Sequence, residues 1–300
     1  MSAVADRLIP PSLPARIGAR AAGLSRRSPT LAVGAAILLA FALMAVFHRF
    51  LMPYDPVAVD AMSVLKPPSA AHWFGTDGNG MDVFSRVIYG AIYAYGIAVP
   101  VVIVGIGLGI PIGLFTGWRG GWADEIFMRA MDALRVFPSI ILALAVVAAA
   151  GPSLLNVVLV LGFLDAPVFA RVVRAEVLAL RGGTFVEAAV AAGNPTARIL
   201  FVHLMPNALR GAIAQSAVRA AWAVRISATL AFLGVGLQPP TPEWGAMIRQ
   251  GAEFMVSGEW WVAIFPGIAL VLMVLGLNML GDGVADLMDP RRRAAGGAVK

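Results

Sequence analysis

Three ionisable residues lie inside long apolar runs, and they are the first candidates for chemistry. Apart from Asp165, Arg219 and Arg225, these runs carry no charge. Charges in apolar surroundings are costly, and they usually face a bundle interior or a wet pathway. At about 1.5 Å per residue, Asp165 and Arg219 fall at a similar depth, so we expect them to form a structural ion pair. Arg225 lies about two turns further out, and it either lines a pathway for a carboxylate-like group or pairs with another subunit.

The other reactive side chains do not form a catalytic set. The chain has no cysteine, and His48, His72 and His203 are far apart in the sequence. Neither a Ser/His/Asp triad nor a histidine–cysteine metal site is therefore expected. The two lysines, Lys66 and Lys300, do not follow the glycine pattern of a phosphate-binding loop. We expect no catalytic residue, no metal and no cofactor bound by this chain.

One acidic stretch briefly resembles a calcium-binding loop. Asp77 and Asn79 take the first and third positions of such a loop, and Asp82 follows. Met81 and Ile88 then occupy the fifth and twelfth positions, where the loop requires oxygen ligands. The stretch is better interpreted as a solvated segment rich in turns.

A polar stretch at residues 183–207 lies between two strongly apolar runs. Thr184 followed by Glu187 predicts a capping box, and Gly193 predicts the left-handed end of a short helix. Asn194 and the proline after it predict the start of a second helix, with asparagine as its N-cap. Pro206 marks the end of that helix or a kink. The stretch therefore predicts two short helices that meet at a glycine.

The composition indicates a polytopic membrane protein that is all-α. Of the 300 residues, 59% are hydrophobic and only 13% are charged, against about 25% in soluble domains. The net charge of +6 is explained by arginines at cytoplasmic membrane edges, and no basic patch alternates with stacking aromatic residues. Nucleic acid is therefore not an expected partner.

The apolar runs predict six membrane-spanning helices with both termini in the cytoplasm. The predicted spans are 31–47, 87–118, 136–150, 154–170, 211–237 and 260–281. The domain organisation is then a cytoplasmic N-terminal segment 1–30, a transmembrane domain 31–288 and a cytoplasmic tail 289–300. Exterior loops are expected at 52–86 and 238–259, and a cytoplasmic loop is expected at 181–207, between the fourth and fifth spans.

The second predicted span carries a stripe of small residues. Gly105, Gly109, Gly113 and Gly117 recur every four residues and share one helix face. Such a face lets another helix approach closely. Pro100 and Pro111 are candidate kink positions in the same span.

Three groups of residues resemble one family of membrane proteins. They are Glu187-Ala188-Ala189 with Gly193 and Leu204-Met205-Pro206, then 72–77 with 82–86, and then 232–236, 238–245, Asn278, 281–283 and 289–290. Across residues 30–293 the chain resembles inner-membrane permease subunits of ABC importers in the dipeptide/oligopeptide/nickel family. The form of its first exterior loop resembles the second of the two permeases that such systems pair.

The resemblance implies partners and a coupling site. It implies a second homologous permease, two cytoplasmic ATPases that bind ATP and Mg, and an exterior substrate-binding protein, all at a bacterial inner membrane. The 181–207 loop would then be the coupling helix pair that docks on an ATPase. Its implied contact residues are Thr184, Phe185, Glu187, Ala188, Ala189 and Gly193. Glu187 has two candidate roles: it caps its own helix, or it pairs with a basic residue on the ATPase. We favour the cap.

The substrate is left open by the sequence. Di- or oligopeptides are the leading interpretation, and a nickel or metal-chelate importer is the alternative within the family. A stand-alone secondary transporter with Asp165 as proton carrier is an alternative of another class, but no inverted repeat supports it. The chain departs from the family pattern at Met81, Met205, Arg225 and Ser227, which bears on substrate choice.

Overall fold

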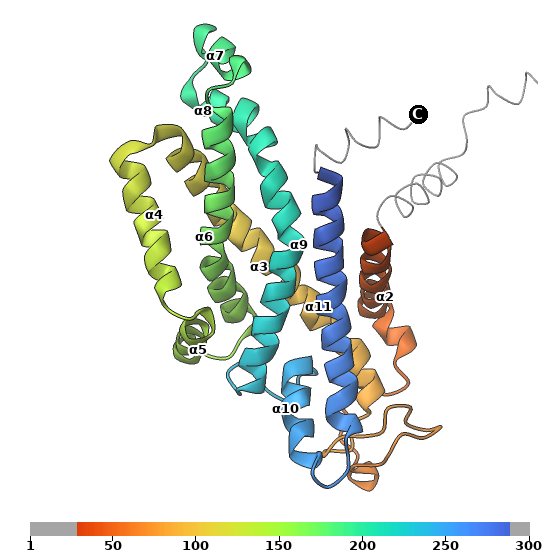
Figure 1. Cartoon of the computed structure of the whole chain (residues 1–300). Coiled ribbons are helices and arrows are strands. Elements are labelled where there is room, and N and C mark those ends of the chain that lie inside the picture. Colours follow the sequence, from red (N-terminus) through yellow and green to blue (C-terminus); the bar gives the residue numbers. More distant parts are fainter. Residues whose placement is uncertain (1–28, 289–300) are drawn as a thin grey trace, which may run out of the picture.

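The computed structural model describes residues 29–288, and these form a bundle of helices (Figure 1). Almost all of the predicted N-terminal segment 1–30, and the whole tail 289–300, lie outside the described residues. In chain order the elements are α2 (Pro29–Leu51), the 3-10 helix η2 (Ala61–Ser63), α3 (Val83–Arg119), α4 (Gly121–Val136), α5 (Ser139–Ala150), α6 (Leu154–Leu180), α7 (Thr184–Ala191), α8 (Thr196–Arg198), the π-helix η3 (Ile199–Leu204), α9 (Met205–Phe232), α10 (Trp244–Phe254) and α11 (Trp261–Met288). The all-helical prediction is confirmed.

Four of these helices, α2, α3, α6 and α11, are long and apolar enough to cross a membrane. The number becomes five if α4 and α5, which meet at a bend of 86°, count as one broken span. The third span was predicted at 136–150, but α5 has 12 residues and is only about 18 Å long, against a hydrocarbon core of about 30 Å. The fifth predicted span falls on α9, which is long enough but carries three arginines and is not among the four.

The bend between α4 and α5 separates a polar helix from an apolar one. Pro138 lies at this break, and a proline disfavours the helical conformation of the residue before it. Two ion pairs join α4 to α6: Arg174 donates to both carboxylate oxygens of Asp124 at 2.6 Å, and Arg171 contacts Asp132. These ion pairs attach α4 to α6. The charged side chains that form them are the reason why the sequence of α4 does not resemble a membrane span.

The glycine stripe of α3 packs against α6, as predicted. A Cβ atom on Gly109 would lie 2.7 Å from the carbonyl oxygen of Ala166, and one on Gly113 would lie 2.5 Å from that of Ala170. Real Cβ atoms do not approach other atoms so closely, so the two backbones can meet only because these positions lack a side chain. Pro100 and Pro111 lie within α3, which is continuous over 37 residues.

The two polar segments of the chain lie at opposite ends of the bundle (Figure 1). The short helices α7 and α8 protrude at one end, beyond α6 and α9, and the loop before α3 lies with α10 at the other end. Between them α9 runs close to α6, α3 and α11 and buries an alanine-rich face, which includes Ala212, Ala220 and Ala223. Small side chains on α9 let these neighbours pack closely around it.

Candidate functional site

The protruding helix α7 has an inner and an outer face. Val186 and Ala189, three residues apart on one face, are buried against a cluster that includes Val177, Leu204 and Ala208 from the helices below. This spacing places both side chains on one side of the helix. The cluster packs α7 against the π-helical turn η3 and the ends of α6 and α9.

Four of the six predicted coupling residues present exposed side chains on α7. They are Thr184, Phe185, Glu187 and Ala188. Ala189 was predicted with them, but the structure turns it inward, to the anchoring face. Val190 is 52% exposed and joins the outer face. Sequence reasoning missed Val186 and Val190, and the i, i+3 spacing of Val186 and Ala189 was the signal that could have found the inner face.

The predicted capping box at the start of α7 is wrong by one residue. Gly183, with an extended backbone, occupies the N-cap position, and Thr184 already lies inside the helix. No side chain caps this end, because a capping box joins the N-cap residue to the third helical residue, which here is Val186. Glu187 is exposed and makes no side-chain hydrogen bond within the described residues. It therefore lacks the capping role that we favoured.

The predicted glycine end of α7 is confirmed. Gly193 has φ of +72°, its N–H donates to Val190 O at 2.9 Å, and the N–H of Asn194 donates to Ala189 O at 3.2 Å. This pair of bonds is a Schellman motif. The side-chain amide of Asn194 also donates to Ala189 O at 3.0 Å.

The second predicted helix begins later than expected. Asn194 was predicted as its N-cap, but its side chain closes α7 instead, and α8 begins at Thr196 with Pro195 before it. The helix then continues through the π-helical turn η3 into α9, and Pro206 lies in the first turn of α9. Pro206 therefore does not end the helix, and it follows the π-helical turn, where the regular ladder of backbone hydrogen bonds is already interrupted. The connection from α7 to the bundle is therefore helical from Thr196 onward.

The predicted ion pair between Asp165 and Arg219 is present. Asp165 on α6 is fully buried, and Arg219 on α9 donates to its Oδ1 from the guanidinium group. The same guanidinium lies 4.5 Å from the ring centroid of Trp222, a cation–π contact. The pair links α6 to α9 in mid-bundle, and Trp222 is a further member that the sequence did not reveal.

Arg225 differs from Arg219 in its surroundings. Its side chain is exposed on α9, and the described residues offer it no ion pair or side-chain hydrogen bond. Its backbone carbonyl accepts a hydrogen bond from the Thr229 hydroxyl at 2.8 Å. A charge that projects from an apolar bundle without an internal partner needs one elsewhere.

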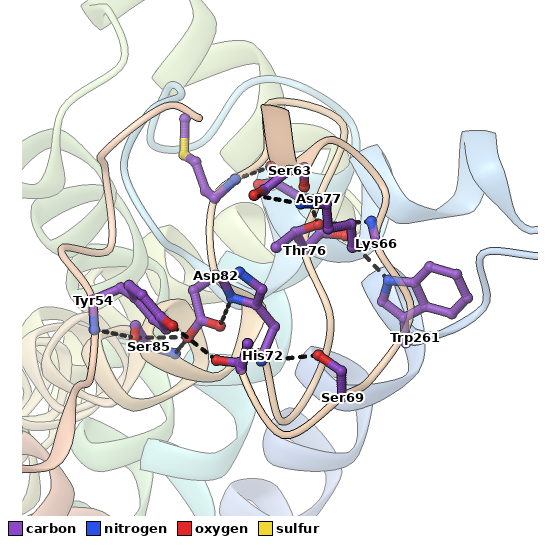
Figure 2. Close-up of polar contacts among 12 residues, drawn as sticks. Tyr54, Ser63, Lys66, Ser69, His72, Thr76, Asp77, Asp82, Ser85 and Trp261 are labelled. Carbon is purple, nitrogen blue, oxygen red and sulfur yellow. Dashed lines mark hydrogen bonds and ion pairs between the residues drawn. The ribbon is translucent and has the colours of Figure 1, made fainter. Parts of the chain in front are cut away.

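The loop at residues 52–82 is built around its acidic side chains (Figure 2). Asp82 accepts the backbone N–H and the hydroxyl of Ser85, both at 2.8 Å, and lies 2.9 Å from Nδ1 of His72. Asp77 accepts the N–H groups of Asn79 at 2.8 Å and Met81 at 3.0 Å. Both carboxylates therefore accept hydrogen bonds from nearby groups of the chain, which gives them a structural role.

Arg86 is a structural residue that sequence reasoning placed only at the end of the loop. It is 2% exposed at the start of α3, and its Nη1 donates to Pro56 O at 2.9 Å and to Pro240 O at 3.3 Å. Its Nε lies 3.5 Å from Asp77 Oδ2, and its Nη1 contacts the sulfur of Met81. Arg86 thereby joins the 52–82 loop to the segment before α10.

Glu243 forms the N-cap of α10 and is buried. Its Oε2 accepts the N–H of Ala246 at 2.9 Å. Burial raises the pKa of the Glu243 carboxyl to about 7, against the opposing effect of backbone hydrogen bonds from Ala246 and Gly245. A buried carboxyl that titrates near neutrality therefore caps the helix at this end of the bundle.

Comparisons with known proteins identify the family. Residues 109–294 match the family described as binding-protein-dependent transport system inner membrane component. The chain is 39% identical over 262 residues to a dipeptide transport system permease protein of Alkalihalophilus pseudofirmus, covering 87% of this chain and 86% of the relative. It is 39% identical over 276 residues to a probable D,D-dipeptide transport system permease protein of Escherichia coli, covering 91% and 92%. It is 40% identical over 270 residues to a glutathione transport system permease protein of Pectobacterium atrosepticum, covering 90% and 89%. The chain therefore belongs to this family of inner-membrane components, as a permease subunit of a binding-protein-dependent ABC importer.

Proposed function

We propose that this permease subunit forms part of the pathway of an importer for di- or oligopeptides or solutes of similar size. The names of its relatives, which refer to dipeptides, D,D-dipeptides and glutathione, support a peptide-like substrate. In this proposal a second homologous permease completes the pathway, two cytoplasmic ATPases hydrolyse ATP with Mg, and an exterior binding protein delivers the substrate. This chain itself is not an enzyme.

The proposed membrane arrangement has six crossings. The four apolar helices supply four, the bent pair α4–α5 supplies the third crossing in chain order, and α9 supplies the fifth. The burial of Asp165 and its contact with Arg219 support the crossing by α9, because the pair removes one of its charges from contact with lipid. In this arrangement both termini and α7 are cytoplasmic, and α10 with the 52–82 loop is exterior.

The observation that carries the proposal is the two-faced geometry of α7. Its inner residues Val186 and Ala189 fix it to the ends of α6 and α9, and its outer residues are free to meet another protein. A short helix joined rigidly to two spans can transmit a displacement into the membrane domain. Glu187, which has no side-chain partner among residues 29–288, would meet a basic group on the ATPase.

Copurification tests this coupling site. We expect Phe185→Ala with Glu187→Lys to lose most of the ATPase that is recovered with the detergent-solubilised transporter. Arg129→Ala should lose none, because Arg129 forms a surface pair with Glu125 on α4. Full recovery of the ATPase with the α7 double variant would contradict the coupling role.

Arg225 is proposed to line the substrate pathway and to meet an anionic group such as a peptide carboxylate. Its exposure on α9 and the absence of an internal partner among residues 29–288 support this role. We expect Arg225→Gln to lower the uptake of a peptide with a free carboxylate more than that of its C-terminal amide, with both peptides shown to bind the binding protein. An equal loss for both peptides, together with loss of the partner permease on purification, would assign Arg225 to the interface instead.

A further inference from the structure

A cavity of about 590 Å³ lies where the C-terminal end of α2 meets the start of α3. Its lining includes His48 and Arg49 from α2, Tyr54 and Asp55 from the loop that follows, and Tyr89 and Tyr93 from α3. None of these residues belongs to the coupling helix or to the intramembrane charges. The cavity is therefore separate from the features that the proposed function uses.

The cavity is rich in hydrogen-bond donors that lack acceptors. Arg49 is exposed, Tyr89 and Tyr93 are half-buried, and within the described residues none of the three side chains has a hydrogen-bond or ion-pair partner. His48 Nδ1 lies 2.9 Å from Ala45 O, so its Nε2 is turned to other partners. A guanidinium and two phenol groups in one lining suit an oxyanion, because each of them can donate to an anionic oxygen.

The walls of this cavity are held in place by contacts of their own. The His48 ring packs edge-on against Tyr89, with ring centroids 5.2 Å apart, and Tyr89 lies 6.0 Å from the ring of Tyr93. The Tyr54 hydroxyl donates to Ala71 O at 3.0 Å. The carboxylate of Asp55, the acidic side chain in the lining, accepts the N–H of Val57 at 2.9 Å. These contacts hold the rings of His48, Tyr89 and Tyr54, and one carboxylate oxygen of Asp55 is bound to the loop backbone, so that the basic and hydroxyl groups of the lining outnumber its single acid.

The apolar surface beside the cavity indicates the source of the anion. Of the four candidate spans, α2 has the smallest buried share. Close to the cavity it exposes Val46 by 70%, Phe47 by 48% and Phe50 by 87%. Cationic and tyrosine side chains at the end of such a helix lie at the depth of lipid headgroups.

We propose that this cavity binds the phosphate of a phospholipid headgroup, with Arg49 as the main contact and Tyr89 and Tyr93 as hydroxyl donors. The acyl chains then lie along the exposed face of α2, next to Phe47 and Phe50. A simpler role for Arg49 is to complement the dipole at the end of α2, but that role leaves the two tyrosine hydroxyls in the cavity without function. The site fixes the outer end of α2 in the bilayer.

Native mass spectrometry of the complete transporter in detergent tests the site with short-chain phosphatidylglycerol as the probe. A hydrogen bond to a charged group contributes about 1.5–3 kcal/mol, so we expect Arg49→Gln to weaken lipid binding about tenfold or more. Tyr89→Phe with Tyr93→Phe should weaken it by a smaller factor. Arg249→Gln is the matched control, because Arg249 is also an exposed cation without a partner in the described chain, on α10, at the same end of the bundle. An equal effect of Arg249→Gln, or no effect of Arg49→Gln, would overturn the proposal.

Two further probes separate the possible sources of the phosphate. Diacylglycerol of the same chain length lacks the phosphate, and inorganic phosphate lacks the chains. We expect both to bind far more weakly than phosphatidylglycerol. Equal binding of diacylglycerol would show an apolar contact only, and competition by inorganic phosphate at the same concentration would show a site for free anions. Either result would overturn the lipid assignment, and neither depends on transport.

Discussion

Asp165 on α6 and Arg219 on α9 form an ion pair that is buried on the acidic side and covered by Trp222 on the basic side. Asp165 Oδ2 has no hydrogen-bond partner, so Arg219 is the main stabilising contact of this carboxylate. The two helices are far apart in the sequence, and the pair joins them where α9 would otherwise place a charge in an apolar environment. Its removal should therefore affect folding more than chemistry.

We expect Arg219→Leu to destabilise the transporter by about 3–5 kcal/mol, because it leaves the Asp165 carboxylate buried without a partner. Asp165→Leu should have an effect of the same sign, reduced because Arg219 is partly exposed and keeps Trp222. Thermal unfolding in nanodiscs measures both. The double variant should recover most of the loss, since paired apolar side chains often replace a buried ion pair without cost. A double variant as unstable as the sum of the two single variants would contradict this account.

The close contact between α3 and α6 can be tested at two glycines of the same helix. Gly113→Ala should destabilise the protein by about 1–3 kcal/mol, because its Cβ would meet Ala170 O at 2.5 Å and the helices would have to separate. Gly107→Ala is the control, because nothing lies within 4 Å of the added Cβ. Alanine has the higher helix propensity, so Gly107→Ala should be neutral or stabilising. Similar melting temperatures for the two variants would contradict the contact.

The sequence predicted those features that depend on regular spacing or on the depth of a residue within a membrane span. The glycine stripe follows from a four-residue repeat, and the partner of Asp165 follows from counting residues along two spans. The capping register of α7 was missed because a shift of one residue, from Thr184 to Gly183, changes which side chains can reach the helix end. The inward turn of Ala189 was missed because its i, i+3 spacing from Val186, which places both side chains on one face of α7, was not considered.

Long-range contacts account for the rest of what the sequence did not show. Two of the partners of Arg86 are carbonyl groups 30 and 154 positions away in the chain, and no local pattern connects them to it. The bend between α4 and α5 was missed because 136–150 was interpreted from its apolar content alone, without regard to Pro138. The residues that support such features can be recognised in the sequence only once the three-dimensional arrangement is known.

The glycine at the end of α7 gives a prediction about the local stability of this helix. Gly193→Ala should lower the free energy of local unfolding of α7 by about 1–2 kcal/mol, because an L-residue is strained at φ of +72°. Nothing lies within 4 Å of the added Cβ, so the effect is conformational and not steric. Gly193→Asn is the matched variant, since asparagine tolerates the left-handed region, and it should recover most of the protection of the α7 amides in hydrogen exchange. Equal protection in the wild type and Gly193→Ala would contradict the role of this turn.

The N-cap of α10 gives a prediction about pH. Because burial raises the pKa of Glu243 to about 7, above its ordinary value of 4.5, the folded state binds this proton more tightly than the unfolded state. The stabilisation is fully present below pH of about 4.5 and is lost as the pH rises through about 7, by up to roughly 3 kcal/mol. Hydrogen exchange of the α10 amides, corrected for intrinsic rates, should therefore show less protection at pH 8 than at pH 5.

A variant separates the charge of Glu243 from its hydrogen bond. The amide oxygen of Glu243→Gln can still accept the N–H of Ala246, but the group no longer titrates. We expect Glu243→Gln to keep the protection of α10 nearly constant between pH 5 and pH 8, whereas Glu253→Gln, on the exposed face of the same helix, should retain the pH dependence of the wild type. Loss of protection with rising pH in Glu243→Gln as well would show that another group causes the change, because the glutamine amide does not titrate in this pH range.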